Sequence, residues 1–268
     1  MTLCVAVIGA GVIGGAIARR LIESQAAEKV IATRRRVERL RPLEEIGVVA
    51  TRDNRWAAGE ADVVFICVKP NDVRNVLEEI RDRVEDKLVI STAAIIPLSY
   101  YRSIAPEARY VRTMPNIAAL IGESFTAYAC DERVTEEDRR LIRRLLEPLG
   151  PCEEVEEKHL DAITGLSGSG PAYIAIVIDS LLYAGLKVGL PRELALRSSA
   201  QAVLGTAKLV LEGCLDTSKV KEMVTTPGGT TIEGIYQLED SAIMTAFMRA
   251  VESATEKCRL LREKLGIE

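Results

Sequence analysis

Short, uninterrupted apolar runs alternate with segments of helical periodicity over the first half of the chain. Residues 3–8 form the first such run, which ends at Gly9, and residues 62–68 form a longer one, which closes at Lys69-Pro70. Runs of this length are typical of strands buried on both faces of a parallel sheet. The remaining candidates are strands at 29–33, 87–91 and 108–114 and helices at 11–24 and 71–83. The alternation predicts a parallel, doubly wound α/β sheet.

The second half of the chain shows helical patterning alone. Thr135-Glu136-Glu137-Asp138 has the form of a capping box, which predicts a helix to about residue 147. After residue 165 the pattern indicates no strand, and helices are expected over 171–188, 191–212 and 241–265. We therefore expect an α/β domain over residues 1–160, followed by an all-helical domain over residues 161–268.

Apolar side chains surround the predicted helix on all sides between residues 173 and 186. Such a helix must be covered by other structure around its whole circumference. Asp179 and Lys187 interrupt the run, and the unbroken stretch falls short of the roughly 18 residues of a membrane span. A small helical domain covers such a helix poorly by itself. We therefore expect a homodimer with helices from both chains, and no membrane partner.

Composition narrows the classes of function. The chain has 268 residues, of which 48% are apolar and 28% charged, and its net charge is −4, as in an ordinary globular protein. Nucleic acid is not expected as a partner, because phosphate binding needs a basic face. Met1 leads directly into a strand-like run, which leaves no room for a signal peptide, so we expect a cytoplasmic protein.

Cysteine and histidine give no sign of a metal site or of nucleophilic catalysis. The six cysteines lie far apart without a CxxC motif and mostly in apolar runs, so buried thiols in a reducing compartment are expected at Cys4, Cys67, Cys130, Cys152, Cys214 and Cys258. His159 is the single histidine and follows an acidic stretch, which indicates a solvated position. Ser-His-Asp and Cys-His mechanisms would depend on that one residue, and no metal is expected.

The first candidate site is the turn Gly9-Ala10-Gly11-Val12-Ile13-Gly14. It follows a predicted buried strand and opens a predicted helix, and the next strand ends about twenty residues later, which is the setting of a dinucleotide-binding turn. Gly9 permits the tight turn, Gly11 lets the backbone approach a pyrophosphate, and Gly14 lets helix and strand pack closely. The helix N-terminus adds free N–H groups and the positive end of its dipole. We predict that a nicotinamide dinucleotide binds here.

Arginines follow the second predicted strand, at Arg34-Arg35-Arg36. Sites for NAD usually have an Asp or Glu at this place, which accepts hydrogen bonds from the ribose 2′-hydroxyl. The guanidinium group of arginine instead can donate two parallel hydrogen bonds, which match the 2′-phosphate of NADP. A solvated helix start is the alternative interpretation of the same residues. The pattern favours NADPH, with NADH as the second choice.

Four further segments carry small or polar residues where ligands could bind. Val68-Lys69-Pro70 and residues 112–116 each lie at the end of a predicted strand, and ligands of open sheets bind beyond the carboxyl ends of strands. Residues 166–173 (LSGSGPAY) and 225–231 (TTPGGTT) offer N–H groups and hydroxyls that suit an anion such as a carboxylate. Strand-ending turns, an interdomain hinge and a helix–helix connection are the plainer alternatives.

With these segments in view, the chain resembles the pyrroline-5-carboxylate reductase family over nearly its whole length. The glycine turn, VKP at 68–70 and MPN at 114–116 are similar to the family's N-terminal domain. LSGSGPAY, GLPRELA at 189–195 and TTPGGTT are similar to its helical domain. The resemblance implies an α/β Rossmann-type dinucleotide-binding domain followed by an all-α dimerisation domain. It also implies hydride transfer from NAD(P)H to the C=N bond of 1-pyrroline-5-carboxylate, giving L-proline in the last step of proline biosynthesis.

The resemblance also assigns roles to residues. Cofactor binding is implied for Gly9, Gly11, Val12, Ile13, Gly14, Arg34, Asn54, Val68, Lys69, Pro70, Ala93 and Asn116. Substrate binding is implied for Thr226, Gly228, Gly229, Thr230 and Thr231. Thr231 is the expected catalytic residue, because its position is the one expected to contact the ring nitrogen. Family members form interlocked dimers through the helical domain, often assembled further into decamers.

Two positions depart from the family's usual pattern. The family usually has AAG where this chain has Ala93-Ala94-Ile95, and it usually has MPNTPA where this chain has residues 114–119, with Ile117. Both segments are expected near the nicotinamide, so a bulky Ile95 could alter cofactor fit or substrate choice. Two other functions are alternatives: a 3-hydroxyacid dehydrogenase, with Lys187 as its candidate lysine, and a cofactor-binding regulatory protein without turnover.

Overall fold

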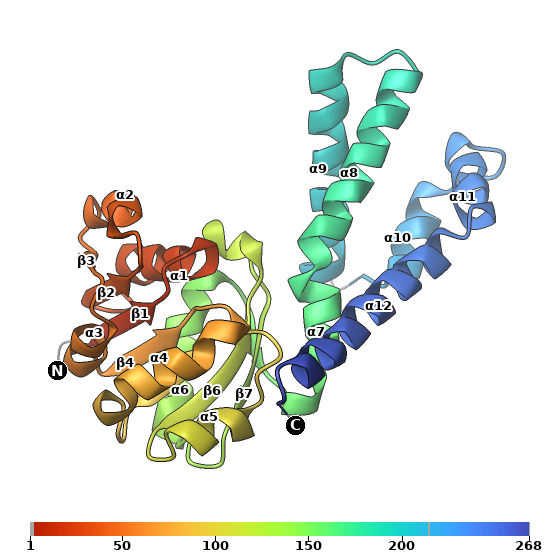
Figure 1. Cartoon of the computed structure of the whole chain (residues 1–268). Coiled ribbons are helices and arrows are strands. Elements are labelled where there is room, and N and C mark those ends of the chain that lie inside the picture. The colour runs from red at the N-terminus through yellow and green to blue at the C-terminus, as the bar shows by residue number, and fades with distance from the viewer. Residues whose placement is uncertain (1–2, 214, 268) are drawn as a thin grey trace. The chain divides into compact units, whose positions relative to one another are not determined.

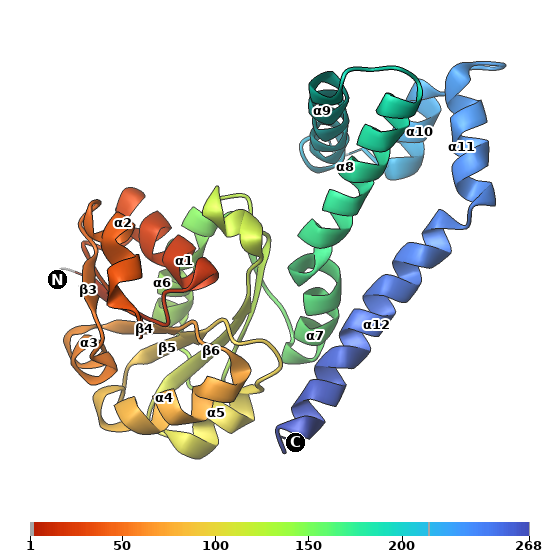
Figure 2. The ribbon, with the colours of Figure 1, turned by 45° about the horizontal axis from the view of Figure 1, so that its top comes forward.

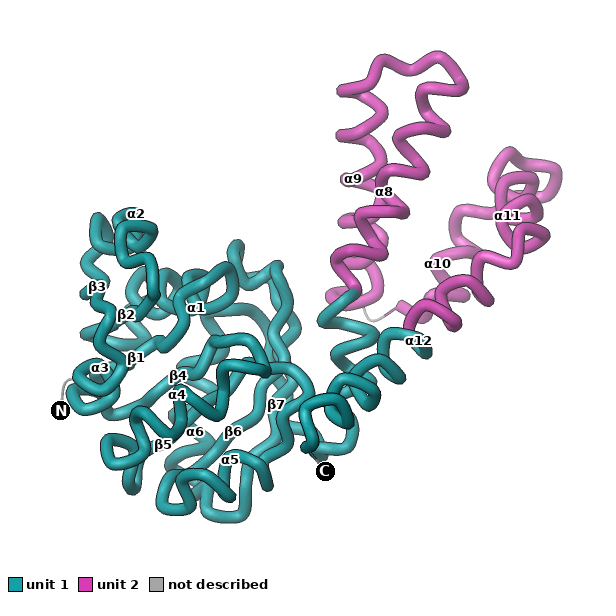
Figure 3. The backbone as a smooth tube through the Cα atoms, in the orientation of Figure 1, with its two compact units in different colours: residues 1–169, 252–268 teal, residues 170–251 magenta. Residues whose placement is uncertain are grey.

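The computed structural model (Figures 1 and 2) describes residues 3–213 and 215–267, and the chain divides into two compact units (Figure 3). The sheet unit comprises residues 1–169 and 252–268, and the helical unit comprises residues 170–251. The expected division into functional domains at 1–160 and 161–268 stays a prediction. Cys214, expected to be buried, lies outside the described residues.

The sheet unit is built on a sheet with the strand order β3-β2-β1-β4-β5-β6-β7-β8. The strands are β1 (Cys4–Ile8), β2 (Lys29–Thr33), β3 (Val49–Thr51), β4 (Val63–Ile66), β5 (Leu88–Ser91), β6 (Arg109–Met114), β7 (Thr126–Cys130) and β8 (Cys152–Glu154). All five predicted strands are confirmed to within two residues. The strand order reverses between β1 and β4, and ligands of doubly wound sheets bind at that point.

Helices cover both faces of this sheet (Figure 1). They are α1 (Val12–Glu23), α2 (Arg41–Glu44), α3 (Asn54–Glu60), α4 (Val73–Ile80), α5 (Leu98–Ile104), α6 (Glu136–Leu146) and α7 (Leu160–Ile163). One apolar core joins α1, α2 and α6 to Val5 and Val7 of β1. The other core joins α3, α4, α5 and α7 to Ala6 and Ile8 of the same strand. Because both sides of β1 face a core, its sequence is a continuous apolar run.

The five predicted strands pair parallel, as expected, and β7, which was not predicted, adds one antiparallel pair. β6 and β7 pair antiparallel, with Met114 opposite Ala127. The connection between them, residues 115–125, contains one short 3₁₀ helix, η4 (Ile117–Leu120). A parallel neighbour needs a crossover of a dozen or more residues, usually with an α-helix, so this shorter connection reverses the strand direction instead.

The helical unit contains α8 (Gly170–Lys187), α9 (Arg192–Leu211), α10 (Thr217–Val224), α11 (Thr230–Asp240) and the start of α12 (Ile243–Lys264), whose last turns belong to the sheet unit. The predictions for α8, α9 and α12 are confirmed to within two residues. Helices α8 and α9 lie side by side (Figures 1 and 2). A Cβ on Gly185 would lie 2.8 Å from the Cβ of Ala195, so glycine allows this close approach.

The predicted apolar helix is largely exposed within the single chain. Ile176 and Tyr183 of α8 are 65% and 62% exposed. Residues 157–187 form one helical stretch that is long and apolar enough to span a membrane by length and composition. The helical stretch is longer than the prediction from Pro171, because the π-helical turn Thr164–Gly168 and α7 precede α8. Asp179 and Lys187 interrupt its apolar run, as the sequence indicates. An apolar surface of this kind needs a cover, from lipid or from protein.

Candidate active site

The glycine turn is fixed by the ends of two neighbouring strands. The register places Ile8 of β1 opposite Thr33 of β2, and the N–H groups of Gly9 and Ala10 donate to the Thr33 carbonyl at 3.2 and 2.8 Å. Gly9 has a φ of 89°, and a Cβ there would lie 2.6 Å from Cγ1 of Val68. Any other residue would therefore meet both a strained backbone and a steric clash.

Gly14 has no space for a Cβ atom, whereas Gly11 has open space. A Cβ on Gly14 would lie 2.6 Å from the Gly9 carbonyl oxygen and 2.9 Å from the Cβ of Cys67, so α1 packs directly on the turn. At Gly11 the nearest atom would be 4.0 Å away, which leaves open space over the start of α1. Gly11 is the N-cap, no side chain caps this helix, and its first turn carries no acidic residue. The helix N-terminus is thus accessible to an anion.

A groove with a cavity volume of about 790 Å³ extends from this turn over the ends of β1, β2 and β4. Gly9, Gly11 and Thr33 contribute to its lining. Its basic side chains are Lys69 together with Arg34, Arg35, Arg36, Arg39 and Arg52. A groove of this size and charge fits the phosphorylated adenosine half of NADP.

Two polar side chains of the groove are held in place. Nη1 of Arg34 donates to the Ala10 carbonyl at 3.2 Å, which fixes the guanidinium beside the glycine turn. Asn54, the first residue of α3, accepts from the Thr33 hydroxyl at 2.6 Å and donates to Glu79 at 2.8 Å. The groove also contains two carboxylates: Glu79 accepts from this amide, and Asp72 lies 3.6 Å from the guanidinium of Arg35. Because the groove contains six basic side chains, positive charge still dominates.

Two arginines of the groove, Arg39 and Arg52, were not predicted from the sequence as site residues. Arg39 comes from the 3₁₀ helix Val37–Leu40, and Arg52 follows β3. The parallel register pairs Thr33 with Thr51, so the residues after both strands meet at one edge. The three-residue strand β3 was too short to be predicted, and with it the signal for Arg52 was lost.

A second set of expected cofactor residues follows the ends of β4, β5 and β6. Val68 and Lys69 line the groove. Ala93 is buried, and its N–H donates to the Ser91 hydroxyl at 3.2 Å. The Asn116 side chain donates to the Ser167 carbonyl at 3.1 Å and accepts from the Ala118 N–H at 2.9 Å. The residues expected on the nicotinamide side thus follow adjacent strands, and hydrogen bonds within the protein hold Ala93 and Asn116.

The expected cofactor residues divide by their relation to the groove. Six line it: Gly9, Gly11, Arg34, Asn54, Val68 and Lys69. The other six lie outside its lining, at the start of α1 or after the neighbouring strands: Val12, Ile13, Gly14, Pro70, Ala93 and Asn116.

The expected substrate residues lie in the helical unit, at the turn that opens α11. Gly228 has a φ of 68°, and the N–H of Gly229 donates to the Thr226 carbonyl at 3.0 Å. Gly229 is the N-cap of α11 and provides no side-chain cap, so the helix starts with Thr230 and Thr231. From the sequence, Thr230 and Thr231 were considered part of a segment that connects two helices. Their N–H groups belong instead to a helix N-terminus, which suits a carboxylate.

Two other candidate groups are unsuited to nucleophilic or acid–base work. Burial raises the pKa of the Cys67 thiol to about 12, so it stays protonated at neutral pH. The His159 side chain is 55% exposed and lies 4.0 Å from Glu156, which confirms its predicted solvated position. The five described cysteines are free thiols, but only Cys4 and Cys258 are fully buried, so the expectation of buried cysteines holds in part.

Comparison with known proteins gives matches over nearly the whole chain. Residues 157–261 match the model of pyrroline-5-carboxylate reductase dimerisation, and residues 4–95 match the model of coenzyme F420-dependent NADP oxidoreductase. The chain is 38% identical to the pyrroline-5-carboxylate reductase of Methanosarcina acetivorans, over 96% of this chain and 97% of that protein.

Solved structures agree with the sequence matches. The structure of a pyrroline-5-carboxylate reductase from Coxiella burnetii has a TM-score of 0.90 and 31% identity, and the match covers 97% of this chain and 99% of that one. The pyrroline carboxylate reductase of Plasmodium falciparum with NADP bound has a TM-score of 0.86 and 27% identity, covering 97% of each chain. These matches confirm the predicted order of a Rossmann-type domain followed by an all-helical dimerisation domain.

Proposed function

This chain belongs to the pyrroline-5-carboxylate reductase family, and we propose that it reduces the C=N bond of 1-pyrroline-5-carboxylate with NAD(P)H to give L-proline. The observation that carries the proposal is similarity over the full length, from the glycine turn to the TTPGGTT segment. Purified protein should consume NADPH when 1-pyrroline-5-carboxylate is added and should release proline. Turnover with 3-hydroxyacids instead, or cofactor binding without any turnover, would refute this function.

Bound NAD(P)H supplies the hydride, and the residues of the sheet unit bind and orient it. We propose that the N–H groups of Val12, Ile13 and Gly14 bind the pyrophosphate, since no side chain caps the start of α1. Arg34 and Asn54 would bind the adenosine side, where the arginines favour NADPH over NADH. The nicotinamide half would lie along Val68, Lys69, Pro70, Ala93 and Asn116.

The substrate would bind at Thr226, Gly228, Gly229, Thr230 and Thr231. N–H groups at the start of α11 suit its carboxylate, and the Thr231 hydroxyl would orient the ring nitrogen. A cyclic imine can bind already protonated, so the reaction needs correct positioning more than a strong acid. The solvated position of His159, the chain's one histidine, agrees with this requirement.

Replacing Thr231 with alanine tests its role. A hydrogen bond to a charged group contributes about 1.5–3 kcal/mol, so Thr231→Ala should lower kcat/KM by roughly 10- to 150-fold, and Thr231→Ser should restore most of it. Thr217→Ala is the matched control, because Thr217 also opens an exposed helix of the same unit. Equal kcat/KM for Thr231→Ala and Thr217→Ala would remove Thr231 from the mechanism.

We further propose a cytoplasmic homodimer formed through the helical domain and able to assemble into a decamer. The match of residues 157–261 to a dimerisation model and the exposed apolar face of α8 support this arrangement. Light scattering on the purified protein should give at least twice the chain mass. Ile176→Asp, at a position that is 65% exposed in the single chain, should shift the mass toward the monomer. Monomeric wild-type protein would contradict the proposal.

A further inference from the structure

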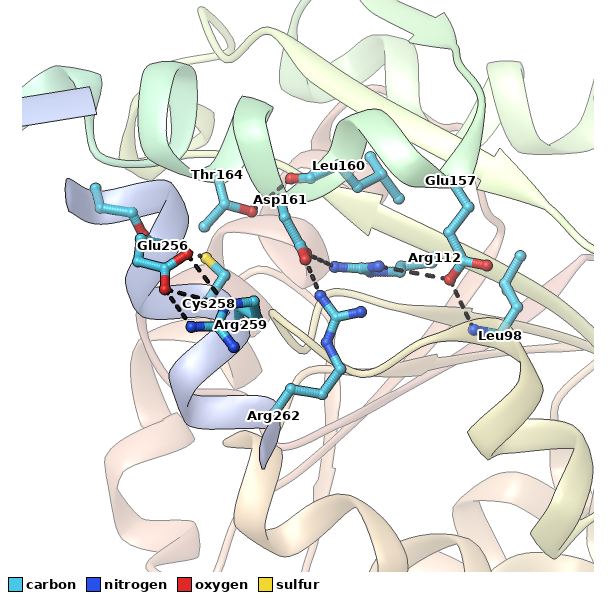
Figure 4. A network of polar contacts seen from close by, with 11 residues as sticks. Leu98, Arg112, Glu157, Leu160, Asp161, Thr164, Glu256, Cys258, Arg259 and Arg262 are labelled. Atoms are coloured by element: carbon cyan, nitrogen blue, oxygen red, sulfur yellow. Dashed lines mark hydrogen bonds and ion pairs between the residues drawn. The ribbon is translucent and has the colours of Figure 1, made fainter. Parts of the chain in front are cut away.

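Four charged side chains form one network inside the sheet unit (Figure 4). Arg112 of β6 is only 2% exposed, and its Nη2 donates to Asp161 at 2.6 Å while its Nη1 lies 3.5 Å from Glu157. Arg262, near the end of α12, donates to the second oxygen of Asp161. The two positive and two negative charges balance, which is what burial of the central arginine requires.

Glu157 makes a second contact, with the first residue of α5. Its Oε1 accepts the N–H of Leu98, the first residue of α5, at 2.8 Å (Figure 4). The N-cap position of α5 is Pro97, which offers no side-chain cap. The carboxylate of Glu157 therefore caps this helix from a distant part of the chain and holds the point where the loop 92–97 ends.

The loop 92–97 connects β5 to α5 and contains a strained residue. Ile95 has a φ of 67°, in the left-handed region that β-branched residues strongly disfavour. Ile95 is 3% exposed and belongs to the apolar core with Ile96 and Leu98. The same loop carries Ala93, which is expected on the nicotinamide side. A conformation of this kind persists only where the surroundings hold it.

Two hydrogen bonds hold the backbone of this loop on either side of Ile95. The Ala93 N–H donates to the Ser91 hydroxyl at 3.2 Å, and the Ser91 hydroxyl also bonds to the Tyr101 hydroxyl at 2.6 Å. The Leu98 N–H donates to Glu157, which the buried Arg112 faces. The second of these hydrogen bonds depends on a side chain far away in sequence, which the buried Arg112 faces.

We propose that Glu157, oriented by Arg112, is a positioning residue that keeps the loop 92–97 in the conformation that Ile95 disfavours, and thereby keeps Ala93 in place for the cofactor. The proposal rests on the proposed function, since Ala93 is assigned to the nicotinamide side there. It differs from a role in general stability because it depends on the strain at residue 95. A glycine at position 95 adopts the left-handed conformation freely and should need no clamp.

The test is a double-mutant cycle between positions 157 and 95. Glu157→Ala should raise the Kd for NADPH about tenfold, measured by cofactor fluorescence without substrate, and should raise the KM for NADPH more than it lowers kcat. In the Ile95→Gly background the same substitution should change Kd less than twofold. Glu157→Gln keeps an acceptor for the Leu98 N–H and should restore Kd to within threefold of wild type. Glu156→Ala is the matched control, because Glu156 is exposed and pairs with its neighbours Lys158 and His159.

The outcomes separate the alternatives. Equal effects of Glu157→Ala in both backgrounds would mean a contribution independent of the strained loop, and an unchanged Kd would remove the clamp; either result overturns the proposal. Arg112→Met should also raise the Kd for NADPH, and the increase should be smaller in the Ile95→Gly background. Thermal melting adds a readout that needs no cofactor: Ile95→Gly should melt above Ile95→Ala if the left-handed strain is real, and the reverse order overturns the proposal. Kd and melting temperature are measured without turnover. They therefore test the positioning role of Glu157 even if the protein does not catalyse the proposed reaction.

Discussion

Alanine substitutions at three glycines of α1 and its N-cap should separate folding from cofactor binding. The structure gives each position a different environment within five residues of chain. At Gly14 a Cβ would overlap the Gly9 carbonyl oxygen, at 2.6 Å, and the Cβ of Cys67, at 2.9 Å. At Gly11 the nearest atom would be 4.0 Å away, and at Gly15 none lies within 4 Å. The same added methyl group therefore tests packing at Gly14, approach of the ligand at Gly11 and helix propensity at Gly15.

The expected magnitudes follow from these environments. Gly14→Ala must displace backbone that is itself hydrogen-bonded to Thr33, so it should cost about 1–3 kcal/mol and lower Tm by roughly 2–12 °C. Gly15→Ala should raise stability by about 0.5–1 kcal/mol, because glycine is unfavourable inside a helix. Gly11→Ala should change stability by less than about 1 kcal/mol, yet it adds a methyl group where the pyrophosphate would approach the backbone. A tenfold or larger rise in the NADPH Kd, about 1.4 kcal/mol, is expected there.

Two measurements on the same three proteins check this reasoning. Thermal melting without cofactor measures the change in stability, and fluorescence titration with NADPH measures the Kd. Gly15→Ala is the internal control, since it should bind NADPH as wild type does. If Gly11→Ala binds NADPH with unchanged Kd, the pyrophosphate does not approach the open face over Gly11. If Gly14→Ala melts at the wild-type temperature, α1 is not packed against the turn as closely as the distances indicate.

Two further predictions concern charge. Arg34→Ala should raise the NADPH Kd by about 10- to 100-fold and leave the NADH Kd within threefold, because a charged hydrogen bond to the 2′-phosphate contributes about 1.5–3 kcal/mol. Arg41→Ala is the control, because Arg41 is exposed and lies outside the groove. Equal losses of affinity for both cofactors would contradict a role of Arg34 in binding the phosphate. Burial raises the pKa of Cys67 from 9.0 to about 12, so the folded protein keeps a proton that the unfolded chain loses above pH 9. Stability should therefore fall by up to about 1.4 kcal/mol per pH unit from pH 9 to 12 in urea titrations, and Cys67→Ala should flatten that decline.

The sequence predicts those elements whose residues face a core on every side or whose ends carry local signals. β4 is recognisable because Val63, Val64, Phe65 and Ile66 are all buried. The start of α6 is recognisable because Thr135 and Asp138 form the predicted capping box, a contact between residues close in the chain. In both cases the information lies within the segment itself.

The elements that were missed depend on partners far away in the chain. β7 has a mixed sequence, TAYAC, and it is a strand because it pairs with β6 on one side and β8 on the other. α5 starts after Pro97 without a side-chain cap of its own and is capped by Glu157 instead. The candidate site follows the same division: the glycine turn is a local signal, whereas Arg52 reaches the groove only through the pairing of β3 with β2.

Ile95 shows why a departure from a family's pattern needs a structure before it can be interpreted. From the sequence, a bulky residue in place of glycine was expected to act on the cofactor through its side chain. The side chain instead lies in the apolar core, 3% exposed, and the unusual feature is the backbone, with a φ of 67°. Left-handed backbone costs a non-glycine residue about 1–2 kcal/mol, and burial of an isoleucine side chain contributes a similar or larger amount. The substitution is therefore tolerable in stability, and any effect on the cofactor must pass through the position of the loop and the contacts that hold it.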